Sequence, residues 1–227
     1  MLGKILQRFK KQPIGAEHIN DAVAHYKKGC KWTEKERYSE ALEEFKYSST
    51  IIQTEALIYF RLGFTYFKLN CFSEAKKAYQ KFIELHANLD MNSGLDIDDD
   101  LDIGVIKAEA YNHLGLIYDS EGKFVKAIGS FLNSIRIIRS NADALNNLGE
   151  TYFKMGIYHD AIKAHEQVLA FDSDNARAHY RLGLVYLDLR ERQQVMKESE
   201  ILEDLDKGLA DDLMNRLQYT SSYSVRS

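Results

Sequence analysis

The feature that most constrains the fold is a short motif that recurs at a fixed interval. It consists of a Tyr, Leu or His, two variable residues, Leu-Gly, two variable residues and Tyr, and its glycines are Gly63, Gly115, Gly149 and Gly183. The last three are separated by 34 residues each, and the gap of 52 between the first two equals 34 plus an insertion of 18. Counting back 34 residues from Gly63 gives Gly29, which marks a weaker copy. This self-similarity indicates an array of small repeated units.

A second set of residues keeps the same period after each glycine. Alanine follows four of the glycines by twelve residues, and a large aromatic residue or histidine follows each alanine by four. The alanines are Ala41, Ala75, Ala127 and Ala161, and the residues that follow them are Phe45, Tyr79, Phe131 and His165. The spacing of apolar positions indicates two amphipathic helices per unit. We expect Gly and Ala where the helices cross, because a close crossing leaves no room for a longer side chain.

At these residues the chain resembles the tetratricopeptide repeat family, whose unit is a helix-turn-helix of the same length. The resemblance implies an all-α fold, a right-handed superhelical solenoid of about five repeats plus a C-terminal capping helix. The array would span residues 15–218, with repeats at 22–55, 56–89, 108–141, 142–175 and 176–209. The remaining segments would be a basic amphipathic stretch at 1–14, an acidic insertion at 90–107, a cap at 210–218 and a disordered tail at 219–227.

The chain departs from the family pattern in the terminal repeats and at the repeat ends. The proline that commonly closes a unit is absent, since the only proline is Pro13. The fifth repeat has Val195 and Ser199 in place of the expected alanine and aromatic residue. Terminal repeats are often atypical because one of their faces meets solvent or a cap. Helical spacing after the fifth repeat predicts such a cap through Leu209, Leu213 and Leu217.

Resemblance to this family implies a concave groove that holds a peptide or a helix of a partner protein. Positions 2, 5, 6, 9 and 12 of each repeat should line it, because the core uses the others. Aromatic residues beside arginines on such a face are typical of binding hot spots. The predicted groove residues are Phe60, Arg61, Phe64, Phe67, Asn112, His113, Asn147, Glu150, Arg177, Tyr180, Arg181 and Leu184. The alternative is that the three phenylalanines pack against neighbouring repeats or the insertion and contact no ligand.

Three of these residues resemble part of the carboxylate clamp by which some family members hold the C-terminal carboxylate of a chaperone. They are Asn147, Arg177 and Arg181. The other two clamp positions fall at Asn112 and Leu116, and a leucine cannot hydrogen-bond to a carboxylate. A looser contact of the two arginines with an anionic peptide stays open as an alternative.

The acidic insertion matches part of a calcium-binding loop. Asp98, Asp100, Asp102 and Glu109 occupy positions 1, 3, 5 and 12 of the calcium-loop template. Position 6, where the sharp turn needs glycine, is Ile103. We therefore interpret the insertion as a solvated acidic loop without a metal. A loop of this charge could lie over the mouth of the groove, where it would act as a gate or as a competitor for an anionic partner.

Composition excludes several classes of function. A formal net charge of -4 does not favour binding to the phosphates of nucleic acids. No stretch approaches the roughly 18 apolar residues of a membrane-spanning helix, and Lys4 and Arg8 interrupt any signal-peptide core. The expected location is the cytoplasm. Neither the histidines nor Cys30 and Cys71 form a catalytic or metal-binding motif, so no catalytic residue, cofactor or metal is predicted.

The sequence thus predicts a non-enzymatic scaffold or adaptor that binds a protein or peptide ligand in the groove. The alternative is a peripheral membrane or organelle-associated assembly scaffold. Its anchor would be residues 1–11, where Leu2, Ile5, Leu6 and Phe9 share one face of a short basic helix. The same helix could instead cover the first repeat or dock on a partner, and self-association stays open.

Overall fold

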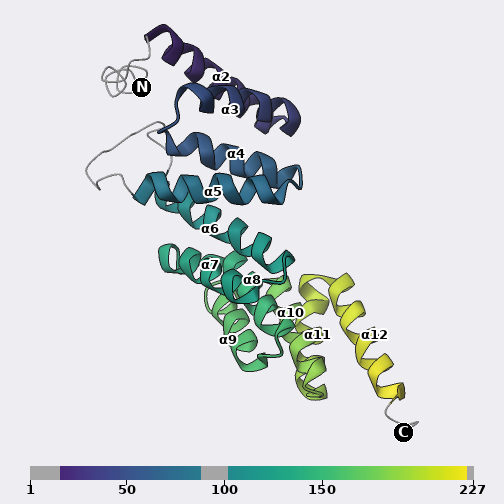
Figure 1. Cartoon of the computed structure of the whole chain (residues 1–227). Coiled ribbons are helices and arrows are strands. Elements are labelled where there is room, and N and C mark those ends of the chain that lie inside the picture. Colours follow the sequence, from purple (N-terminus) through teal and green to yellow (C-terminus); the bar gives the residue numbers. More distant parts are fainter. Residues whose placement is uncertain (1–15, 88–101, 224–227) are drawn as a thin grey trace. The chain divides into compact units, whose positions relative to one another are not determined.

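A computed structural model describes residues 16–87 and 102–223, and every regular element within these ranges is a helix (Figure 1). The predicted all-α class is therefore confirmed. The chain divides into two compact units, Met1–Ile117 and Tyr118–Ser227. The predicted N-terminal segment 1–14, most of the predicted insertion and the last four residues lie outside the described ranges. None of the described helices is long and apolar enough to cross a membrane.

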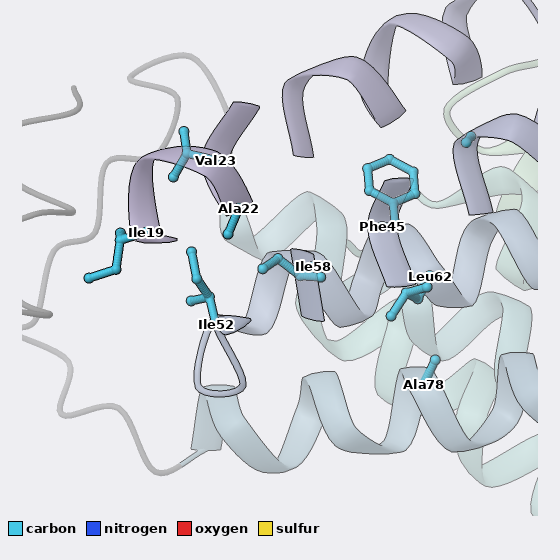
Figure 2. Close-up of a cluster of buried hydrophobic side chains, with 9 residues drawn as sticks. Ile19, Ala22, Val23, Phe45, Ile52, Ile58, Leu62 and Ala78 are labelled. Carbon is cyan, nitrogen blue, oxygen red and sulfur yellow. The ribbon is translucent and has the colours of Figure 1, made fainter. Parts of the chain in front are cut away.

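The first unit is built from helical hairpins. Helix α2 packs on α3, α3 on α4 and α4 on α5. Figure 2 shows apolar side chains from these four helices meeting in one cluster, among them Ile19, Phe45, Ile58, Leu62 and Ala78. The helices of this unit are α2 (Ala16–Glu34), α3 (Tyr38–Ile51), α4 (Ala56–Lys68), α5 (Phe72–Ala87) and most of α6 (Ile103–Ser120).

The second unit contains the last residues of α6 and six further helices. Helix α8 packs on α7 and α9, α10 on α9 and α11, and α11 on α12. Two asparagines cap the N-termini of helices α8 and α10, at repeat ends where the family pattern would have a proline just before. The side-chain oxygens of Asn141 and Asn175 accept hydrogen bonds from the backbone N–H groups of Ala144 and Ala178, both at 3.0 Å. The helices are α7 (Phe124–Ile137), α8 (Ala142–Lys154), α9 (Tyr158–Leu169), α10 (Ala176–Asp188), α11 (Arg192–Leu205) and α12 (Lys207–Tyr223).

The recurring glycines are small for the reason that the sequence suggests. A Cβ atom on Gly63 would lie 2.7 Å from the Tyr79 ring, and one on Gly149 would lie 2.6 Å from the His165 ring. Distances this short are not compatible with van der Waals contact. In each of these hairpins the first helix therefore needs glycine, because the large side chain of the second helix lies directly against its backbone.

The turn inside each hairpin has the same backbone geometry in all five repeats. The fifteenth residue of each repeat adopts a left-handed backbone conformation, with φ between 57° and 72°. The next residue donates its N–H to the carbonyl five residues earlier, for example from Ile157 to Tyr152 at 2.9 Å. Only glycine and asparagine adopt this conformation readily. The residues at this position are Glu36, Asn70, Gly122, Gly156 and Arg190.

The last hairpin depends on α12 for its closure. Ser199 stands where the earlier repeats have an aromatic residue or histidine, and a Cβ atom on Gly183 would lie 2.4 Å from the Leu213 side chain of α12. Leu213 thus fills the space that Ser199 leaves. Helix α12 begins at Lys207 and ends at Tyr223, so it is longer than the predicted cap, and residues 219–223 of the predicted tail are helical.

The end of the acidic insertion also differs from the prediction. Helix α6 begins at Ile103, five residues before the predicted start of the third repeat. The carboxylate of Asp102 accepts a hydrogen bond from the Gly104 N–H at 2.7 Å, so it caps this helix. No group of acidic residues, His or Cys in the described ranges is arranged to hold a metal ion.

Candidate interaction surfaces

The predicted groove residues lie on the first helices of the repeats and fall into one group in each unit. In the first unit, the predicted residues Arg61, Phe64 and Phe67 come from α4 and His113 comes from α6, which also carries Glu109. All five side chains are half-buried. We call these five residues the aromatic surface.

His113 connects the two helices of the aromatic surface. Its ring stacks on Phe67 with a centroid distance of 4.5 Å and lies 6.1 Å from Phe64. Its Nδ1 is 2.7 Å from the hydroxyl oxygen of Tyr79 on α5. Burial, reinforced by the positive charge of Lys68, lowers the pKa of His113 to about 4. The imidazole is therefore neutral at neutral pH and adds no charge to the aromatic surface.

The side chains of Phe64 and Phe67 are held by ring contacts and are still partly accessible to solvent. Phe64 makes an edge-to-face contact with Tyr38 at 6.3 Å, and the ammonium group of Lys68 lies 5.3 Å from its ring centroid. Phe67 lies 5.7 Å from Phe72. Such contacts fix the orientation of both rings, and the half-buried side chains leave part of each ring to a ligand.

Phe60, which was predicted to line the groove, is a core residue. Its side chain is only 4% exposed and packs against Phe82 and Tyr79 with centroid distances of 5.6 and 6.0 Å. The prediction for this residue is wrong, because the second helix of its own hairpin covers the ring; these contacts lie within its own repeat and not with a neighbouring repeat or the insertion. Asn112, on α6, is half-buried.

Arg61 lies at the N-terminal side of the aromatic surface. Its Nε is buried and has no hydrogen-bond partner, and the same is true of the hydroxyl of Tyr26 on α2. The Tyr26 hydroxyl lies beside the guanidinium of Arg61, and the two groups interact through their charges and polar atoms; burial raises the pKa of Tyr26. Among the described residues no carboxylate lies within ion-pair distance of Arg61. Burial raises the pKa of Glu109, against the opposing effect of Arg61 and Lys68.

In the second unit the predicted residues form a charged surface together with Asp143. We define the charged surface as Asp143, Asn147 and Glu150 of α8 with Arg177 and Arg181 of α10. Arg177 donates to the side-chain oxygen of Asn147 at 2.7 Å and lies 3.5 Å from the carboxylate of Asp143. Arg181 pairs with Glu150 at 2.8 Å. Each arginine of this surface therefore has an acceptor on the neighbouring first helix.

The pairing continues beyond these five residues. Lys154 of α8 bridges Asp119 at 2.5 Å and Glu150 at 3.4 Å. On α10, the Tyr180 hydroxyl donates to Asp212 of α12 at 2.5 Å. Leu184 of the same helix packs against the apolar core formed by α11 and α12. A ligand carboxylate at the partial clamp would have to displace an internal carboxylate, and Asn147 is only 8% exposed. These contacts do not favour the clamp.

Two lysines were missed by the sequence analysis. Lys68 and Lys154 each lie four residues after a predicted surface residue on the same helix, Phe64 and Glu150 respectively. Because residues four apart share a helix face, extension of the pattern by one position would have found both.

Helical hairpins of constant length, stacked on one another within each unit, define an α-helical repeat scaffold for protein interaction. Models of the tetratricopeptide repeat match residues 56–89, 108–141 and 142–175. The chain belongs to the tetratricopeptide repeat family.

Comparisons with individual proteins agree with this family. The chain is 38% identical over 74 residues to the Tetratricopeptide repeat domain-containing protein PYG7, chloroplastic, of Arabidopsis thaliana. The match covers 33% of this chain and a quarter (25%) of that protein. Among solved structures, MamA has a TM-score of 0.65 at 22% identity, with 82% of this chain and 96% of that chain covered. YrrB, described as a TPR protein with an unusual peptide-binding site, has a TM-score of 0.67 at 15% identity, with 95% and 100% covered. At these identities both structures show the fold alone.

Proposed function

We propose that this protein is a non-enzymatic scaffold that binds a peptide or helical segment of a partner protein, with the aromatic surface as its main contact. The observation that carries the proposal is the combination of half-buried Phe64, Phe67 and His113 with Arg61. Aromatic residues and arginine are enriched at protein interfaces, where a few residues supply most of the binding energy. Rigid rings also lose little conformational entropy when a ligand packs on them.

The charged surface of the second unit is a weaker candidate for a main contact. Its arginines already pair with acceptors from the same unit. A ligand would have to replace these pairs, so the net gain would be small. The peptide-binding site named for YrrB is in line with the proposed function, although that likeness concerns the fold. A location in the cytoplasm stays a prediction, as does the membrane-associated alternative that rests on residues 1–11.

Affinity capture from cell lysate, with bound proteins quantified by mass spectrometry, tests this proposal. We expect Phe64→Ala to lose the partners that the wild-type chain captures, because the substitution removes a ring from the aromatic surface. Val125→Ala is the matched control, since Val125 lies on α7 and is 77% exposed. Arg181→Ala reports on the charged surface and should have the smaller effect. Partners that bind Phe64→Ala as well as the wild-type chain would contradict the assignment.

A further inference from the structure

We infer that Arg61 is a carboxylate-binding subsite, which takes an acidic side chain of the partner segment while a neighbouring apolar side chain of that segment packs on the aromatic surface. The inference rests on the proposed function and specifies the chemistry of the partner.

The arginines on the first helices of the repeats differ in their partners. Arg177 and Arg181 each contact an acceptor from the neighbouring first helix. Arg61 has no such carboxylate, and its buried Nε has no hydrogen-bond partner. Partial burial has removed water from this guanidinium without supplying an ion pair. A carboxylate matches the fork of donors on a guanidinium, so it is the ligand group that best restores the lost interactions.

The charges around Arg61 favour an anionic ligand group over a neutral one. Lys68 adds a second positive charge to the surface, and it acts electrostatically on both Glu109 and His113. Glu109 is the carboxylate among the described residues that acts electrostatically on Arg61, and it would repel an anion. The net charge of these groups is therefore positive but small. A carboxylate at this point gains an ion pair with the guanidinium, whereas a neutral carboxamide would gain none.

The spacing of the surface residues also limits the ligand sequence. Phe64 follows Arg61 by three residues on α4, so the two side chains are neighbours on one helix face, roughly 5 to 6 Å apart at Cβ. In an extended peptide, side chains two residues apart point to the same side and are separated by roughly 6.5 Å. We therefore expect an acidic residue and an aliphatic or aromatic residue two positions apart in the ligand.

Selection from a random-peptide library displayed on phage tests the inference, with the full chain as the target. Selected peptides are then synthesised in two forms, with the acidic residue and with Asp→Asn or Glu→Gln in its place. Their affinities are measured by calorimetry against the wild-type chain and against Arg61→Gln, Glu109→Gln, Phe64→Ala and Arg177→Gln. Arg177→Gln is the matched control, because this arginine belongs to the charged surface of the other unit.

The expected result has a definite sign for each variant. Conversion of the acid to its amide should weaken binding to the wild-type chain about tenfold or more, the range for a charge-assisted hydrogen bond. The same conversion should have little effect on binding to Arg61→Gln. Glu109→Gln should bind the acidic peptide severalfold more tightly, since it removes a repelling charge. Because this substitution is isosteric, it keeps the inference testable even if Arg61→Gln does not fold.

Two results would overturn the inference and leave the proposed function intact. One is that binding depends on Phe64 but is the same for Arg61→Gln as for the wild-type chain. The other is that Glu109→Gln weakens binding, which would mean that the ligand group at this point is neutral or cationic. By contrast, selected peptides whose binding is unaffected by Phe64→Ala would contradict the proposed function itself.

Discussion

The buried histidine of the fourth repeat should make the stability of the second unit depend on pH. The His165 side chain is fully buried, its Nδ1 is 3.0 Å from the Asn146 side-chain oxygen, and its Nε2 has no partner. Burial, with smaller effects from Arg181 and Arg177, lowers the pKa of His165 from 6.5 to about 3. Between these two values the unfolded chain binds a proton that the folded chain does not. The free energy of unfolding therefore falls as the pH falls below 6.5.

The size of this effect at about pH 5 depends mainly on the pKa of the unfolded chain. Each pH unit below 6.5 contributes about 1.4 kcal/mol, so one and a half units contribute about 2 kcal/mol. His165→Phe replaces the histidine by the residue that the first and third repeats have at this position. Phenylalanine cannot bond to Asn146, so the variant is expected to be less stable than the wild-type chain at neutral pH. The informative quantity is the change in stability between the two pH values.

Urea unfolding followed by circular dichroism at about pH 7.5 and about pH 5 measures this change. Relative to the wild-type chain, His165→Phe should lose about 2 kcal/mol less on acidification. Val168→Ala is the control, because it removes buried methyl groups from the same helix without removing a titratable group. It should keep the acid sensitivity of the wild-type chain. If the free energy of unfolding falls by the same amount for His165→Phe and for the wild-type chain, the conclusion that the buried imidazole is neutral is wrong.

Four further substitutions test the fold. Leu213→Ala should destabilise the second unit by about 2 to 5 kcal/mol in urea unfolding, because no other side chain fills the space over Gly183. Gly149→Ala should cost about 1 to 3 kcal/mol through overlap with the histidine ring, whereas Gly129→Ala, which has open space around its Cβ, should raise stability by roughly 0.5 to 1 kcal/mol. Glu36→Gly should raise the melting temperature of the first unit, since it relieves a left-handed backbone at a non-glycine residue; a lower melting temperature would contradict this.

Helical periodicity was sufficient to predict the hairpins and their closest contacts. Gly63 and Gly149 each lie under the large residue that the repeat pattern pairs with them. The pattern also predicted that the fifth repeat needs a cap through Leu213. These features follow from sequence because a helix repeats its faces every 3.6 residues, so spacing alone determines which side chains point toward a neighbouring helix.

The geometry of the turns was only partly predictable from the sequence. Gly122 and Gly156 are typical residues for a left-handed turn, but Glu36 and Arg190 are not, and they adopt the same conformation. The packing of the two helices in each hairpin determines the turn, so it overrides the local preference of these residues.

The sequence by itself determined the repeat unit, the number of hairpins and the helices from which the surface residues come. Only the tertiary structure decided how those residues are used. Phe60 belongs to the core, and Arg181 has an internal carboxylate, whereas Arg61 has none. The physical reason is that periodicity specifies the direction of a Cα–Cβ bond, while the position of a long side chain depends on the residues that the neighbouring helix places within its reach.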